Sequence, residues 1–157
     1  AGDDSAGFSV LMRAAHYGEN EILEKLISAG ADIHQGDSEG ASAVHYAAMH
    51  RHPECLRSLL KSGADINATN LESYTPLAMF LIGLGPLASL EREIDEDQAL
   101  ETLDLLIKNG ADWNAAAETM FTNSGSTQVS VLDVALLGLE LTELPRLAEA
   151  LSRASKN

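Results

Sequence analysis

The sequence predicts an all-α fold, a solenoid in which short helix–turn–helix units stack side by side. A Gly-Ala-Asp motif recurs at residues 30–32, 63–65 and 110–112, first at a spacing of 33 residues and then of 47. Four times a Ser or Thr stands just before an apolar, alanine-rich stretch, and leucines then follow at helical spacing. Such self-similarity at a fixed period is typical of a repeat array.

Each unit is expected to begin with a capped helix. The capping hydroxyls belong to Ser9, Ser42, Thr75 and Ser130. Each can accept a hydrogen bond from an otherwise unpaired N–H of the first helical turn. Pro76 stands at the first helical position, where its missing N–H costs nothing.

The second helix of each unit carries a leucine stripe. In the second unit the stripe consists of Leu56, Leu59 and Leu60, and Gly63 follows the last turn. A residue in the left-handed conformation commonly closes a helix there. One helix pair cannot bury such a stripe alone, so the units have to stack. The small pair Ala47–Ala48 allows the first helix to approach its neighbours closely.

These motifs resemble the ankyrin repeat family, whose unit reads roughly D-x-x-G-x-T-P-L-H-x-A-A, a second helix and then G-A-D-[VI]-N. The best match is DSEGASAVHYAA at residues 37–48 followed by GADIN at 63–67. The resemblance implies a single domain over residues 1–157, with units at about 4–36, 37–69, 70–124 and 125–157. It also implies protein binding through a concave face built from the finger loops and the exposed sides of the first helices.

The array is expected to be complete at four units. Unit one has Arg13 and Lys25 at positions that are apolar in inner units, as expected of a surface that faces water. Residues 145–153 predict a last helix with its charges on the outer side.

Two insertions interrupt the period. The first, around residues 83–97, contains an acidic run at 91–97 that either extends the next helix at its N-terminus or forms a solvated turn. The second, around residues 115–128, is rich in Ser, Thr, Asn and Gly over 118–128 and is expected to be a flexible loop. Both are expected to be loops that either contact a partner or are merely tolerated.

Composition excludes several classes of protein. Ten Lys and Arg against 24 Asp and Glu give a net charge of −14, which disfavours nucleic acid and anionic lipid as partners. No run approaches the roughly 18 apolar residues of a membrane span. Cys55 is the only cysteine and cannot form an internal disulfide. We therefore expect an intracellular monomer, cytoplasmic or nuclear, with no nucleic-acid or membrane partner.

Sites for chemistry are sparse, so we expect no enzyme activity, no cofactor and no metal. Residues 83–88 fit the weak pattern G-x-G-x-x-A, but they follow a helix instead of a strand. Residues 50–55 hold two imidazoles, a carboxylate and a thiol at a spacing that matches no common zinc pattern. Cys55 is expected to be buried, and His45 to reach back to the Ser42 cap.

The four units, aligned in phase, predict the binding surface. Positions before the caps and at the ends of the first helices form adjacent columns that expose aromatic and Met side chains, as interfaces do. The predicted binding residues are Phe8, His16, Tyr17, Glu39, Met49, His50, Glu72, Tyr74 and Ile82. The acids, together with Asp37, are expected to form a rim, so the partner should be a protein or peptide with apolar anchors and basic flanks. Alternatively, Ile82 packs under an insertion and Phe8 only covers the first cap.

Three further possibilities stay open. The chain lacks an initiator Met, so it is alternatively a regulatory or targeting domain of a larger enzyme. A nucleotide-dependent enzyme using the Gly83 region is another reading. The resemblance also implies a possible modification of Asn67, because the spacing from Leu59 to Asn67 looks like that accepted by 2-oxoglutarate-dependent asparaginyl hydroxylases in ankyrin repeats.

Overall fold

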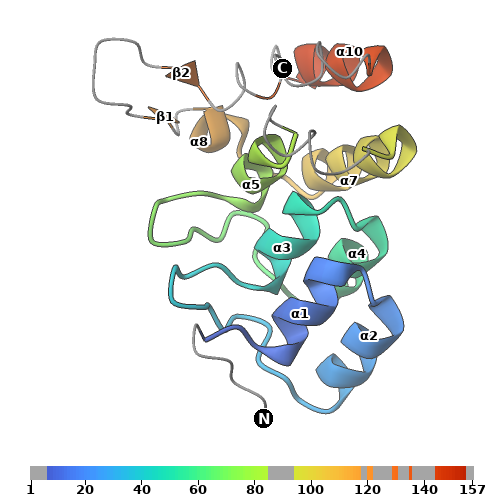
Figure 1. Ribbon diagram of the computed structural model, residues 1–157, viewed down its shortest axis with the longest axis vertical. Helices are drawn as coiled ribbons and strands as arrows, with labels where there is room; N and C mark the ends of the chain where they lie inside the picture. The colour runs from blue at the N-terminus through green and yellow to red at the C-terminus, as the bar shows by residue number, and fades with distance from the viewer. Residues whose placement is uncertain are drawn as a thin grey trace.

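The chain forms two parallel rows of helices in the computed structural model (Figure 1), which describes residues 7–84, 94–117, 120–121, 129–130, 135 and 144–154. The inner row contains α1 (Val10–Tyr17), α3 (Ala43–Met49) and α5 (Pro76–Ile82). The outer row contains α2 (Asn20–Ser28), α4 (Pro53–Lys61), α7 (Glu96–Lys108) and α10 (Pro145–Ala154). Along each row every helix packs against the next, so the predicted all-α stack is confirmed.

Three of the predicted caps begin helices. The Met12 N–H donates to Ser9 Oγ at 3.2 Å, and the Ala78 N–H donates to Thr75 Oγ1 at 3.2 Å. Ser42 is the extended residue before α3. Ser130 lies in a short strand, and residues 131–134 fall outside the described residues, so the helix start predicted there is not tested.

The predicted helix-closing glycines have the conformation that the closure requires. Gly30, Gly63 and Gly110 have φ angles of +88°, +96° and +81°. Nothing lies within 4 Å of a Cβ added at any of the three. Backbone conformation, and not space, therefore selects glycine at these positions.

The core follows the predicted register. Ala47 and Ala48 are fully buried where the inner helices meet, and the outer helices bury a leucine stripe that includes Leu56 and Leu59. Arg13 and Lys25 of unit one are exposed, as predicted. The last helix, α10, buries its leucines and exposes its charged residues, as predicted.

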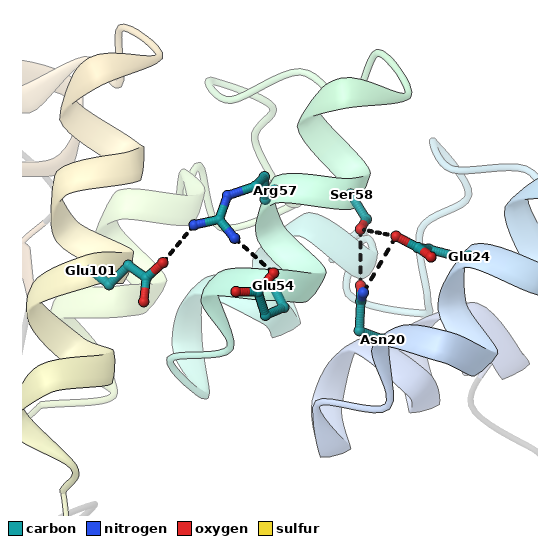
Figure 2. A network of polar contacts seen from close by, with 6 residues as sticks. All are labelled: Asn20, Glu24, Glu54, Arg57, Ser58 and Glu101. Carbon is teal, nitrogen blue, oxygen red and sulfur yellow. Dashed lines mark hydrogen bonds and ion pairs between the residues drawn. The ribbon is translucent and has the colours of Figure 1, made fainter.

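Polar contacts join the outer helices across the units (Figure 2). Ser58 Oγ on α4 lies 2.9 Å from both Asn20 Oδ1 and Glu24 Oε1 on α2, and its single proton can serve one of them at a time. Arg57 on α4 binds Glu101 on α7 at 2.5 Å. The ion pair lies at the surface, so it contributes little to stability.

The first insertion ends in an extended helix. Asp95 caps α7 by accepting a hydrogen bond from the Gln98 N–H at 3.1 Å, and Glu96 and Asp97 form the first turn. Arg146 of α10 binds Asp97 at 2.9 Å. The acidic residues from 95 to 97 thus extend the helix, which was the first of the two alternatives, while residues 85–93 lie outside the described part.

The second insertion begins with structure that the sequence did not predict. Helix α8 (Trp113–Ala117) packs on α5 and buries Ala116, so the expectation of a loop is wrong for residues 115–117. Strand β1 (Met120–Phe121) then pairs antiparallel with β2 (Val129–Ser130), a small addition to the all-α prediction. Residues 118–119 and 122–128, where flexibility was predicted, lie outside the described residues.

Candidate functional site

Five rings form a continuous aromatic cluster across units one and two. We use this name for Phe8, His16, Tyr17, Tyr46 and His50. Phe8 meets Tyr46 edge to face, with centroids 4.9 Å apart, and the centroids of His16 and His50 are 3.9 Å apart. The Tyr17 ring lies 4.7 Å from His16 and is 61% exposed. Four predicted binding residues, Phe8, His16, Tyr17 and His50, are therefore brought together.

Tyr46 is the member of the cluster that the predicted site omitted. Its hydroxyl donates a hydrogen bond to Asp37 Oδ2, and burial together with this carboxylate raises the pKa of Tyr46. Asp37 Oδ1 also accepts hydrogen bonds from the main-chain N–H groups of Glu39 and Ala41, each at 2.9 Å. Asp37 thus holds the finger turn in place and is half-buried, and its part in a binding rim stays a prediction. The Asp or Asn at the start of the finger turns of units two and three, Asp37 and Asn70, was the available signal.

Neighbouring fingers are joined at their tips. Asn70 Oδ1 accepts hydrogen bonds from the N–H groups of Glu72 and Tyr74 at 3.0 and 2.8 Å. The Leu71 N–H donates to the Glu39 carbonyl at 2.8 Å. Glu39 and Glu72 are exposed, as a binding rim requires, while Tyr74 is half-buried and has its pKa raised by burial and by Glu72.

At the C-terminal ends of α3 and α5, the predicted surface is packed tightly between units two and three. Arg51 is buried and donates from Nη1 to the carbonyls of Met49 and Gly83, at 3.2 and 2.6 Å. A Cβ at Gly83 would lie 2.3 Å from the Met49 carbonyl oxygen. Met49 and Ile82 are half-buried beside this contact. Gly83 is thus part of the helix packing, and residues 85–88 of the weak nucleotide pattern lie outside the described part.

Two reactive side chains have structural surroundings. His45 is buried, its Nδ1 accepts from the Ser42 N–H at 3.1 Å, and its Nε2 lies 3.0 Å from the Ala68 carbonyl oxygen. Burial lowers the pKa of His45. Cys55 is fully buried, and burial with nearby acids raises its pKa to about 11, so it is mostly an unreactive thiol near neutral pH. Both predictions for these residues are confirmed.

Comparison with protein-family models gives a match to ankyrin repeats (three copies) over residues 11–117, more than half of the chain. The chain belongs to the ankyrin repeat family. The match counts three copies where the sequence predicted four, and the fourth predicted unit, residues 125–157, lies beyond it. None of the curated proteins compared matches the chain. Ankyrin repeats are generally non-catalytic modules for protein–protein interaction.

The Gly-Ala-Asp turns of successive units are not all joined by the same hydrogen bonds. Asn67 is exposed, but its amide bridges to unit three: Nδ2 donates to the Gly110 carbonyl at 3.0 Å, and Oδ1 accepts from the Asp112 N–H at 2.7 Å. His34 occupies the same position in unit one and lines a cavity of about 180 Å³ between units one and two, which Asp65 also lines. Modification of Asn67 stays a prediction.

Other kinds of site find no support in the part of this ankyrin domain that the structure describes. Within those ranges no three His, Cys, Asp or Glu side chains lie close enough to hold a metal ion. In the same ranges, no helix combines the length and the apolar character that a bilayer crossing needs.

Proposed function

We propose that this ankyrin domain binds a partner protein or peptide through its concave face, formed by the inner helices and the finger loops. The aromatic cluster carries the proposal, because it ends in a tyrosine whose ring is 61% exposed. Tyrosine is enriched in interfaces, where its ring makes apolar contacts while its hydroxyl stays wet.

Charge supports a partner with apolar anchors and basic flanks. Glu39 and Glu72 are exposed on adjacent fingers next to the half-buried Tyr74, and the whole chain carries a net charge of −14. A positively charged segment would be steered toward such a surface.

The proposal also treats residues 125–157 as a divergent fourth unit of one domain. Its second helix, α10, packs on α7 as α4 packs on α2. The setting that we propose is a monomer in the cytoplasm or nucleus, where the single cysteine, Cys55, would stay reduced.

Replacing Tyr17 tests the proposal. A peptide selected from a phage-displayed random library against the wild-type domain serves as the partner, and calorimetry gives its Kd. We expect Tyr17→Ala to weaken binding by about 2 kcal/mol, as for a hot-spot aromatic residue, with a smaller change in the free energy of unfolding. Tyr74→Ala should weaken binding as well, but it also removes a half-buried ring.

Ile107→Ala on α7 is the matched control, because this side chain is also exposed but lies in the outer row. It should leave the Kd unchanged. Binding that survives both tyrosine substitutions and disappears when residues 118–128 are deleted would place the site on the second insertion instead.

A further inference from the structure

Leu71 is more exposed than any other large apolar side chain among the described residues. It is 78% exposed and stands at the tip of the finger between α4 and α5. Single exposed leucines are ordinary on protein surfaces, so exposure alone carries no function. The functional argument for Leu71 comes from the conformation and charge of the finger turn around it.

The fingers of units two and three have the same hydrogen-bonded turn. In unit two the Asp37 N–H donates to the Ala41 carbonyl, and in unit three the Asn70 N–H donates to the Tyr74 carbonyl, at 3.0 and 3.1 Å. In each turn the first side chain accepts from the third and fifth N–H groups. The two tips can therefore be compared position by position, and Leu71 occupies the place of Ser38. The turn itself does not require an apolar residue there.

A second departure lies two residues further on. The fourth residue of these two turns is left-handed, with φ of +77° at Gly40 and +65° at Ser73, and Gly7, at the equivalent place in the sequence of unit one, has φ of +71°. Among the described residues at this position, Ser73 alone has a side chain, and the left-handed conformation is unfavourable for L-amino acids. Strain of this kind is concentrated at functional sites. The tip of unit three thus departs from the pattern of its own chain at two nearby exposed positions.

The tip is held in place before any partner binds. The Leu71 N–H donates to the Glu39 carbonyl of the neighbouring finger at 2.8 Å. Asn70, which organises the turn, is buried. An anchor that is already ordered loses little conformational entropy on binding.

Charge around the tip has a single sign. The chain has no Lys or Arg from residue 26 to 50 or from residue 62 to 91, the two stretches that contain these fingers. The exposed acids of the two stretches within the described residues are Asp32, Glu39, Asp65 and Glu72. A partner that covers Leu71 therefore lies close to Glu39, whose carbonyl accepts from the Leu71 N–H, and to Glu72, the next residue in the chain.

We propose that Leu71 is the anchor that selects the partner: it contacts an apolar side chain of an extended segment whose Lys or Arg residues lie opposite Glu39 and Glu72. The inference rests on the proposed function and adds the contact that gives it specificity. It places the main apolar contact at the finger tip, whereas the aromatic cluster lies along the inner helices.

Peptides selected from a phage-displayed library against the wild-type domain test the inference. They should combine an apolar residue with nearby Lys or Arg. Leu71→Ser installs the residue of unit two and should raise the Kd about tenfold or more, while Ile107→Ser, which removes an exposed apolar side chain elsewhere, should change the Kd less than about twofold. The double variant Glu39→Gln/Glu72→Gln should raise the Kd at low salt and have less effect at about 1 M salt, where charges are screened. Circular dichroism checks that each variant is folded.

The outcomes separate this inference from the proposed function. If Leu71→Ser binds like the wild type and Tyr17→Ala does not, the aromatic cluster is the site, so the Leu71 anchor is refuted and the proposed function stands. If neither substitution changes the Kd, or if no library peptide binds the wild-type domain, both are refuted. Peptides that lack basic residues would also refute the role of the two glutamates.

Discussion

His45 connects a helix cap, a finger and the core through one ring. Because Nδ1 accepts from the Ser42 N–H, the proton of the neutral ring is on Nε2, which donates toward the carbonyls of Ala68 and Tyr74 at 3.0 and 3.2 Å. Those carbonyls belong to the next finger. A second proton on the ring would remove the acceptor for Ser42, so the neutral form is the one that the fold uses.

This arrangement predicts a pH-dependent stability. The folded-state pKa of His45 is lowered by burial from its ordinary 6.5, so between the two values the unfolded chain binds more protons. The contribution of the ring is therefore complete above pH 6.5 and falls as the pH drops toward the folded-state pKa. We expect His45→Gln to cost about 2 kcal/mol in the free energy of unfolding at pH 7.5 and clearly less at pH 5. Urea unfolding at both pH values measures this difference.

The other four histidines are present in both proteins, so comparison of the variant with the wild type at each pH isolates His45. An equal cost at both pH values would contradict the assignment of a neutral, accepting ring.

At the scale of the helices, buried leucines and surface charges contribute unequally to stacking. Leu56 and Leu59 of α4 are fully buried, and each contributes roughly 1.5–3 kcal/mol by burial. The ion pair between Arg57 and Glu101 joins α4 to α7, but both side chains are 46% exposed, and such pairs contribute about 0–1 kcal/mol. The leucine stripe therefore contributes more to the stacking of the units than this ion pair does.

The turns that connect units offer a direct test of one junction. Asn67 bridges units two and three by two hydrogen bonds, whereas His34 stands at that place between units one and two. We expect His34→Asn to form the matching bonds to the Gly63 carbonyl and the Asp65 N–H, and to raise the free energy of unfolding by about 1 kcal/mol. Asn67→Ala should lower it by a similar amount. Guanidinium unfolding of both variants measures these changes.

His34→Ala is the control for this pair. If it stabilises the domain as much as His34→Asn does, the gain comes from losing the imidazole and not from a new bridge.

At the scale of the whole molecule, the free energy of unfolding of a repeat array is approximately the sum of contributions from each unit and from the interfaces between neighbouring units. Each described helix packs within its own unit or on the next unit, so a break between units should stay local. We expect a protease site placed within residues 122–128 to be cut without loss of cooperative unfolding of the units before it. A cut within residues 115–117 should lower the Tm, because α8 packs on α5 through the buried Ala116. Calorimetry before and after cleavage compares the two sites.

Loss of cooperative unfolding after the cut within 122–128 would show that residues beyond the cut are part of one cooperative core with the first units. That result would contradict the view that each unit is stabilised only by contacts with the adjacent units.

Local rules explain most of what the sequence predicted correctly. Ser9 and Thr75 cap helices because a hydroxyl can reach an N–H three residues ahead, and Gly63 closes a helix because only its own φ angle matters. The exposure of Arg13 was predicted by comparing it with the apolar residues at the equivalent positions of the other units. Each of these inferences depends on nearby residues or on the repeat period, which a single sequence contains.

The candidate site was predicted only in part. The repeat alignment brought Phe8, Tyr17 and His50 to one face, because columns of equivalent positions follow from the period. It did not reveal that Tyr46 would donate to Asp37, or that Leu71 would be left in solvent. Both depend on the path of the finger turns and on which side chains those turns cover.

The sequence by itself determined the fold class, the helix boundaries near the caps and the acidic character of the fingers, since these follow from local hydrogen bonding, periodicity and composition. Only the tertiary structure decided which residues of the aligned columns are accessible. Gly83 is enclosed by Met49 and Arg51, whereas Tyr17 stays exposed. The physical reason is that accessibility depends on contacts between units, over sequence distances that no local rule spans.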